Sequence, residues 1–181
     1  MTRVLTAILL AAVTLSLLAS PGYAFRMGIG GFGFRNYSIG DMPNVDLHSG
    51  SLYGAKARLS LIPLFALEPM VTFVDYGKFG VHDVSTEGSL VAYEVNAVIG
   101  TAGGALGPRF YHLFGLGSYR VKLEPGGSES KPGWVAGTGA EIGLWPNISV
   151  DLSARFRWIN TDGDAIKDLG LHAGVNYYFG M

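Results

Sequence analysis

The sequence predicts an all-β protein, an eight-stranded antiparallel transmembrane β-barrel that is preceded by a cleavable signal peptide. Three observations lead to this prediction: alternating apolar and polar segments, an apolar leader, and an aromatic strand at the C-terminus. The segment Ile148–Trp158 shows the alternation most clearly, because every second residue is apolar and those between are Ser, Asp or Arg. Successive side chains of a strand point to opposite faces, so this strand has one apolar and one charged face.

Residues 1–24 have the features of a signal peptide. Arg3 provides a short positive region, Val4–Leu18 is almost uninterruptedly apolar, and Gly22-Tyr23-Ala24 places small residues where signal peptidase requires them. We therefore expect cleavage after Ala24 and one mature domain over residues 25–181. The alternative is an uncleaved anchor, which the shortness of the apolar run disfavours.

The composition separates this chain from helical membrane proteins. Its mean hydropathy is +0.30 and it contains 27 glycines, yet the best candidate for a helical span, Leu59–Val74, is interrupted by Pro63, Glu68 and Pro69. Apolar residues dispersed by alternation are typical of a transmembrane barrel. The mature charge is −2, which predicts no nucleic-acid partner, and the absence of cysteine predicts neither a lipoprotein anchor nor disulfides.

Eight strands of about 11 residues each are predicted, a length that crosses a bilayer at the usual tilt. They are Arg26–Tyr37, Ser51–Leu61, Phe65–Asp75, Ser89–Ile99, Arg109–Val121, Trp134–Leu144, Ile148–Trp158 and Leu169–Phe179. The apolar parity changes within the first strand and predicts a β-bulge at Gly30-Gly31. Pro69 removes a ladder donor from the third strand and predicts another bulge. The fifth strand is apolar on both faces, so its register stays open.

The connectors alternate in character. The three shorter connectors are Ile62-Pro63-Leu64, Thr101–Pro108 and Trp145-Pro146-Asn147. The four longer and more polar connectors are Ser38–Gly50, Tyr76–Gly88, Lys122–Gly133 and Ile159–Asp168. Outer-membrane barrels have short periplasmic turns and longer external loops, so we expect both termini on the periplasmic side. Aromatic residues lie near both ends of the strands, the pattern of two belts at the membrane interfaces.

The last strand adds a resemblance to a known family. Its alternate residues are apolar and end on an aromatic, namely Leu171, Ala173, Val175, Tyr177 and Phe179. With the barrel pattern, the mature chain resembles the small outer-membrane β-barrels that include the OmpA transmembrane domain and the OmpX/Ail-type proteins. Gly180-Met181 after the aromatic departs from the family pattern, and no peptidoglycan-binding domain like that of OmpA is present.

The resemblance has implications for location and partners. It implies export through the periplasm to the outer membrane of a Gram-negative-type bacterium. There we expect contact with membrane lipid and lipopolysaccharide, and recognition of the last strand by the barrel-assembly machinery.

Charged residues occupy many inward positions of the predicted strands. They are Lys56, Arg58, Glu68, Glu94, Glu141, Asp151, Arg155 and Arg157, and we expect Arg120, His112 and His172 to join them. The interior of an eight-stranded barrel is just wide enough for its side chains, and an unpaired buried ion is costly. These residues predict a structural ion-pair network that plugs the barrel. The alternative is a narrow channel lined by the same groups.

Other motifs carry little chemistry. His48-Ser49 is adjacent and in a loop, whereas lipid A deacylases carry their His and Ser one residue apart on a strand. Asp162-Gly163-Asp164 with Asp168 does not match an EF-hand and predicts a turn. The run Gly28–Gly33 has no following helix and is therefore not a phosphate loop. No catalytic residue, metal site or cofactor is predicted.

The sequence thus favours a non-enzymatic role in envelope integrity or adhesion through long loops, with an unidentified surface partner. Three alternatives stay open: a porin-like channel for ions or small solutes, an enzyme acting on outer-leaflet lipid, and a soluble lipocalin-like binder. The aromatic belts and the terminal strand argue against the last.

Overall fold

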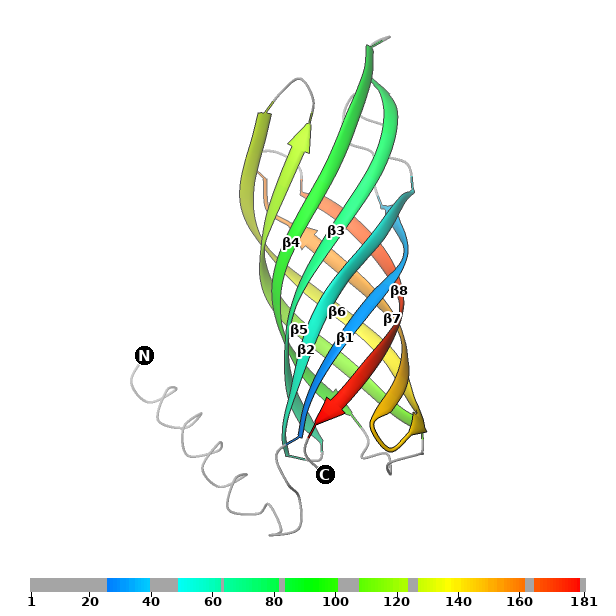
Figure 1. Cartoon of the computed structure of the whole chain (residues 1–181). Coiled ribbons are helices and arrows are strands. Elements are labelled where there is room, and N and C mark those ends of the chain that lie inside the picture. The colour runs from blue at the N-terminus through cyan, green and yellow to red at the C-terminus, as the bar shows by residue number, and fades with distance from the viewer. Residues whose placement is uncertain are drawn as a thin grey trace, which may run out of the picture.

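The computed structural model describes residues 26–39, 49–62, 64–81, 84–100, 108–123, 127–161 and 165–179. The strands are β1 (Arg26–Ser38), β2 (Gly50–Ile62), β3 (Phe65–Val81), β4 (Val84–Gly100), β5 (Pro108–Leu123), β6 (Gly127–Trp145), β7 (Ile148–Ile159) and β8 (Ile166–Phe179). Each strand pairs antiparallel with the next, and β1 pairs with β8 to close the barrel (Figure 1). The predicted eight-stranded antiparallel barrel is confirmed.

Two parts of the prediction lie outside the described residues, namely the leader 1–24 and the terminal Gly180-Met181. Among the described residues, no helix has the length and apolar character needed to span a membrane. We call the end that holds Arg26 and Phe179 the terminal end, and the opposite one the loop end.

Two hairpins at the loop end are longer than predicted. The ladder of β3 and β4 continues to the pair Val81↔Val84, and that of β5 and β6 to Leu123↔Gly127. Both project beyond the closed barrel at the top of Figure 1. The predicted connectors Tyr76–Gly88 and Lys122–Gly133 are therefore largely strand. Backbone hydrogen bonds between strands do not depend on an alternating apolar face, so a sequence pattern need not detect such a ladder.

The predicted bulge at Gly30-Gly31 is wrong. Pairing of β1 with β2 and β8 is continuous through these residues, and Phe32 points into the barrel with 8% of its surface exposed. Its two cross-strand partners are Gly54 and Gly174. A Cβ on Gly54 would lie 2.5 Å from the Phe32 ring, and one on Gly174 would lie 2.8 Å from the Phe32 Cβ. The aromatic ring thus fills interior space that two glycines leave free.

Two other irregular positions also keep a regular register. The β3–β4 pairing is continuous through Pro69, which faces outward opposite Val95, so no bulge forms there. In β5, Tyr111 and Leu113 are buried, whereas Phe114 on the other face is exposed. This resolves the open register of the fifth strand.

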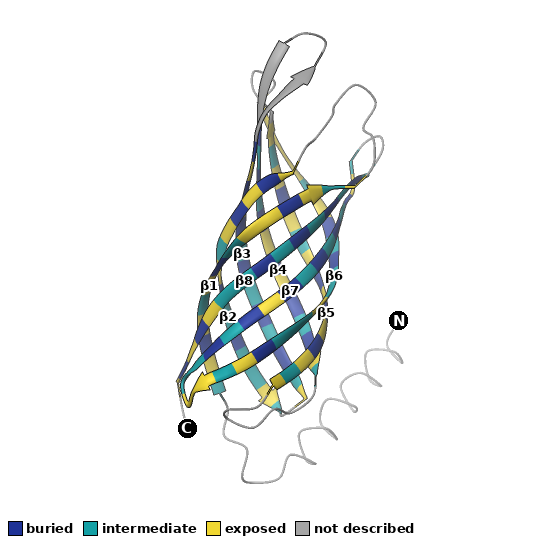
Figure 2. Ribbon diagram, turned by 90° about the vertical axis from the view of Figure 1, so that its right-hand side faces the viewer, coloured by how far each residue is buried: buried dark blue, intermediate teal, exposed yellow. Residues whose placement is uncertain are grey.

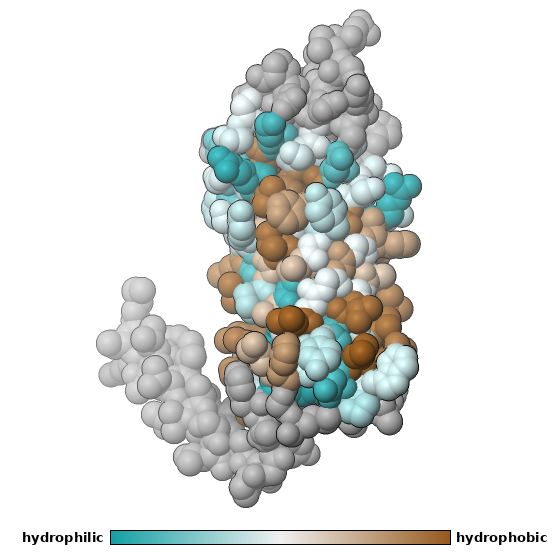
Figure 3. All heavy atoms as spheres, in the orientation of Figure 1, coloured by the Kyte–Doolittle hydropathy of each residue, from teal (hydrophilic) through white to brown (hydrophobic). Residues whose placement is uncertain are grey.

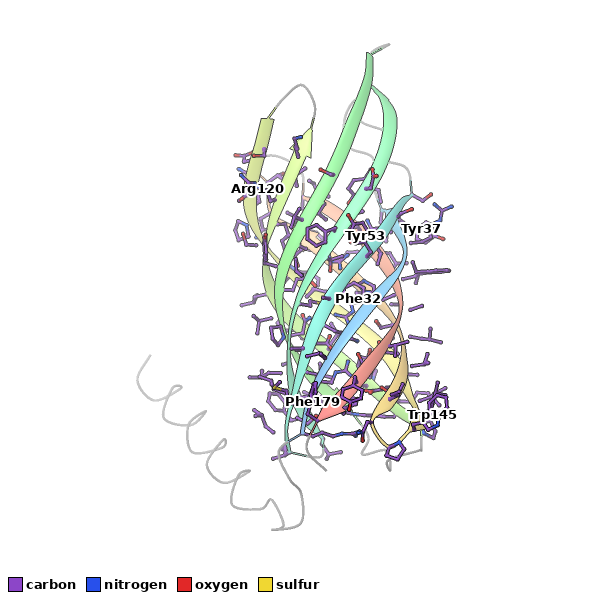
Figure 4. The ribbon with its side chains drawn as sticks, viewed as in Figure 1. Phe32, Tyr37, Tyr53, Arg120, Trp145 and Phe179 are labelled. Atoms are coloured by element: carbon purple, nitrogen blue, oxygen red, sulfur yellow. The ribbon has the colours of Figure 1, made fainter. Side chains whose placement is uncertain are left out.

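The outer face of the barrel is an apolar band with charge at one end. Burial alternates along the strands in Figure 2, and most of the hydrophobic side chains on the face shown in Figure 3 lie in the middle and terminal half. Among the strand residues whose side chains the structure describes, the charged ones at outward positions are Arg35, Asp75, Arg120, Lys122 and Lys167. All five lie toward the loop end. Figure 4 shows Tyr37, Tyr53 and Arg120 there, and Trp145 and Phe179 at the terminal end.

Candidate functional site: the polar interior of the barrel

The interior contains eight of the charged residues expected to face the lumen. They are buried on five strands: Lys56 and Arg58 on β2, Glu68 on β3, Glu94 on β4, Glu141 on β6, and Asp151, Arg155 and Arg157 on β7. His172 on β8 is also inside. The expectation was wrong for His112 and Arg120, which are exposed on the outer face. Because Tyr111 and Leu113 point inward, the even-numbered residues of β5 must point outward.

The half of the interior near the terminal end holds the Glu68 cluster. It comprises Lys56, Arg58, Glu68, Glu141, Asp151 and Arg155. Glu68 contacts all three cations: it accepts from Arg58 Nε at 2.8 Å and from Arg155 Nη2 at 2.8 Å, and it forms an ion pair with Lys56 Nζ at 3.5 Å. Three positive and three negative side chains therefore form a balanced set.

Several of these ion pairs span the lumen. Arg58 on β2 reaches Glu141 on β6 at 2.5 Å and Asp151 on β7 at 3.3 Å. In the closed strand order, β2 and β6 lie on opposite walls. One guanidinium thus ties two walls together through charge-assisted hydrogen bonds.

Neutral groups satisfy the remaining oxygens of the Glu68 cluster. The Tyr111 hydroxyl donates to Asp151 at 2.9 Å, and the Tyr178 hydroxyl donates to Glu141 at 2.5 Å. Ser149 and Asn176 also donate to Glu141. Buried polar networks are stable only when such acceptors find donors, and here the carboxylates of both walls do so.

The half near the loop end holds the Arg157 cluster. Its members are Asn36, Thr72, Tyr76, Glu94, Tyr119, Arg157, Asp168 and His172. Arg157 Nε donates to Glu94 at 2.6 Å, and its Nη1 lies 3.3 Å from Asp168. Tyr119 donates to the same oxygen of Glu94 at 3.0 Å. Here one cation faces two carboxylates, and Glu94 Oε2 and His172 Nδ1 have no hydrogen-bond partner among the residues that the structure describes.

An intermediate layer joins the two clusters. The Met70 sulfur lies 2.7 Å from Arg155 Nη1 and 3.2 Å from Asn96 Nδ2. The Phe32 ring packs against His172 with a centroid distance of 4.8 Å. Side chains thus fill the axis from one cluster to the other.

Sequence reasoning missed one charged member and the tyrosines. Asp168 was assigned to a connector, yet it is fully buried and lies opposite Arg157 on the β7–β8 ladder. Leu169 and Leu171 point outward, so starting the predicted strand one residue earlier would have placed Asp168 on the inner face. Tyr111, Tyr119 and Tyr178 received no role in the sequence analysis, because the period of two along a strand does not distinguish a buried hydroxyl from an apolar ring.

The remaining motifs give no second site. His48 and Asp162-Gly163-Asp164 lie outside the described residues, and Gly28–Gly33 is part of strand β1. Within the described ranges, no group of three or more His, Asp or Glu side chains is arranged to hold a metal ion.

Comparison with known proteins assigns the fold to a family. The model of the outer membrane protein β-barrel domain matches residues 6–179. The chain belongs to this family. It is therefore an outer-membrane β-barrel protein, and members of the family are outer-membrane proteins of Gram-negative bacteria. No curated protein sequence matches the chain at a significant level.

Solved structures share the barrel at low sequence identity. Neisserial surface protein A superposes with a TM-score of 0.64 at 19% identity, covering 86% of this chain and 97% of that one. The attachment invasion locus protein Ail of Yersinia pestis, solved with the heparin analogue sucrose octasulfate, gives 0.57 at 20% identity, with 87% and 100% coverage. The N-terminal barrel of Pseudomonas aeruginosa OprF gives 0.53 at 18%, with 85% and 97% coverage. These likenesses establish the shared fold.

Proposed function

We propose that this barrel is sealed by its interior network and acts through its loop end, in a structural or surface-interaction role without catalysis. The observation that carries the proposal is the burial of the charged side chains inside the barrel, none of which in the two clusters has more than 6% of its surface exposed. Glu68, Arg155, Arg157 and Asp168 each have 0% of their surface exposed. A water-filled pore would leave charged lining groups in contact with water, and these groups have none.

The energetics of the network support a seal. An ion moving along the axis would have to separate Arg58 from Glu141 and Asp151, and then Arg157 from Glu94. Breaking a buried pair leaves an uncompensated charge, which costs about 3–5 kcal/mol for each pair. Two successive clusters therefore oppose conduction more strongly than a single ring of charges would.

The shape of the loop end supports a surface role. The β3–β4 and β5–β6 hairpins extend past the last β2–β3 pair, Ser51↔Asp75, and past the barrel rim (Figure 1). Two of the structural relatives are named for the cell surface or for attachment. We place the loop end outside the cell and the terminal end in the periplasm.

Export and assembly complete the proposal. Residues 1–24 would direct export and be removed. The barrel-assembly machinery would recognise the apolar residues on the outer face of β8, namely Leu171, Ala173, Val175, Tyr177 and Phe179. This strand pairs with β1 and closes the barrel.

Planar-bilayer recording of the refolded mature protein tests the seal. We expect a silent bilayer, with insertion verified by the heat-dependent gel shift of a folded barrel. Discrete, reproducible steps whose size changes with Glu94→Gln would overturn the proposal in favour of a narrow channel.

A further inference from the structure

His112 and Thr138 form a polar pair on the outer face of the barrel. His112 on β5 and Thr138 on β6 are direct cross-strand partners, and both side chains are exposed. The Cβ atoms of such partners lie about 4.5–5.5 Å apart on the same face of a sheet, so the imidazole and the hydroxyl are neighbours. Together they make one polar spot on a surface that is otherwise apolar at this level.

The pair lies within the apolar band of the barrel. On β6, Thr138 lies between Trp134 and Trp145, and Trp145 stands at the terminal end in Figure 4. On β5, His112 precedes Arg120, at the loop end, by eight residues. Eight residues of tilted strand span about 20 Å of the barrel axis, and the apolar band is about 25 Å tall. Apart from tyrosines, the hydrophilic side chains at the other described outward strand positions lie toward the loop end.

The pair has unused hydrogen-bonding capacity. The Thr138 hydroxyl donates to the Tyr111 carbonyl at 3.1 Å, which leaves its oxygen free to accept. The His112 side chain has no hydrogen bond, ion pair or ring contact with another residue in the described part of the chain. A neutral imidazole carries one N–H donor and one acceptor, and lipid tails satisfy neither. Ionisable side chains at this depth almost always face a protein partner, so the surface around His112 needs one.

The wall around the pair consists of a ridge beside a trough. On β5, Phe110 and Phe114 flank His112, with 62% and 57% of their surfaces exposed. Their cross-strand partners on β6 are Ala140 and Ala136. The outward row of β5 is therefore bulky and that of β6 is small over the same length. Small residues on a membrane-embedded surface allow another protein to approach closely.

We propose that this surface joins two copies of the barrel side by side in the membrane. The His112 face comprises Phe110, His112, Phe114, Ala136, Thr138 and Ala140. A two-fold axis parallel to the barrel axis, placed over the boundary of β5 and β6, lays the β5 row of each copy on the β6 row of the other. The imidazole of each copy then donates to the Thr138 hydroxyl of the second copy, and the phenyl rings fill the opposing alanine trough.

Self-complementarity selects a second copy as the occupant. Donor lies beside acceptor and ridge beside trough, so a two-fold rotation satisfies both halves of the face at once. An acyl chain would fill the trough but offer no acceptor to His112. The opposite wall differs, because the outward residues of β2 between Tyr53 and Leu61 are apolar, and the groove that includes Ala55 and Ala57 suits lipid alone.

Energy transfer between labelled copies in phosphatidylcholine vesicles tests the dimer. The chain contains no cysteine, so Ser128→Cys at the exposed loop end of β6 carries either the donor or the acceptor dye. We expect transfer that rises with the protein-to-lipid ratio and saturates as a two-body equilibrium. The ratio at half-saturation should rise at least fivefold in His112→Leu and in Thr138→Val, because each variant removes both intermolecular hydrogen bonds. Ala140→Leu should weaken association to a similar extent by filling the trough.

Tyr53→Phe is the matched control, since it removes an outward hydroxyl from β2 on the opposite wall. Its half-saturation ratio should stay within twofold of the parent protein. No saturable transfer, association unchanged by His112→Leu and Thr138→Val, or equal weakening by Tyr53→Phe and Thr138→Val would each overturn the proposal. Gel shifts verify that every variant is folded. Bilayer recordings of the same samples separate the two proposals, because a barrel that dimerises and conducts contradicts only the seal.

Discussion

The two polar clusters inside the barrel differ in charge balance. The Glu68 cluster pairs three cations with three carboxylates, and Glu68 itself contacts all three cations. The Arg157 cluster has one guanidinium for Glu94 and Asp168, together with two atoms that find no hydrogen-bond partner in the described part of the chain. In the first, any neutralised group leaves an unpaired ion. In the Arg157 cluster, the effect on stability depends on whether the removed charge is positive or negative. The barrel therefore contains one charge-balanced network and one with excess negative charge.

Arg157→Ala should have the largest effect of the variants considered. It leaves Glu94 and Asp168 buried without a cation, so we expect the free energy of unfolding to fall toward the upper end of about 3–5 kcal/mol. Urea unfolding in lipid vesicles, followed by tryptophan fluorescence, measures it. Arg120 lies on the exposed outer face, so Arg120→Ala should change the free energy of unfolding by no more than about 0.5 kcal/mol. Equal effects at the two positions would contradict the assigned network.

Glu68→Gln should be the next most damaging change. Lys56, Arg58 and Arg155 lose their shared anion, but Arg58 keeps Glu141 and Asp151, so we expect a loss near the lower end of about 3–5 kcal/mol. A double-mutant cycle with Arg155→Gln should show coupling of about 1 kcal/mol or more. Additive effects would mean that the two side chains do not interact.

Gly54→Val probes the layer that joins the clusters. The new side chain would collide with the Phe32 ring, which packs on His172, so overpacking should cost about 1–3 kcal/mol. Adding Phe32→Leu should recover part of this loss. Gly31→Ala is the control, because a Cβ there meets its nearest atom only at 3.9 Å. A Gly54→Val barrel as stable as the parent would place Phe32 elsewhere.

Asp168→Asn should have the smallest effect and sharpens the comparison most. It removes the excess negative charge of the Arg157 cluster while keeping the side-chain volume. We expect a change of less than about 1 kcal/mol, measured as for Arg157→Ala. A loss as large as that of Glu68→Gln would show that the two clusters do not differ in charge balance.

Much of the fold could be predicted from the sequence because the period of two is local. The alternation in Ile148–Trp158 gives the faces of β7, and that in Leu169–Phe179 gives those of β8. The prediction from alternation failed in β1 and β5, where apolar side chains also fill the interior. Phe32 broke the parity of β1 because glycines across the ladder made room for it, and β5 read as apolar on both faces because Tyr111 and Leu113 fill the interior.

The sequence by itself therefore determined the barrel class, the number of strands and most of the residues that point inward. Only the tertiary structure decided which charges meet. Arg58 and Asp151 are 93 residues apart in sequence, and Arg157 and Glu94 are 63 apart. Their contact depends on the register of every strand between them and on closure of β1 with β8. Alternation sets the face of each residue within a strand, but the stagger between strands sets its height in the lumen.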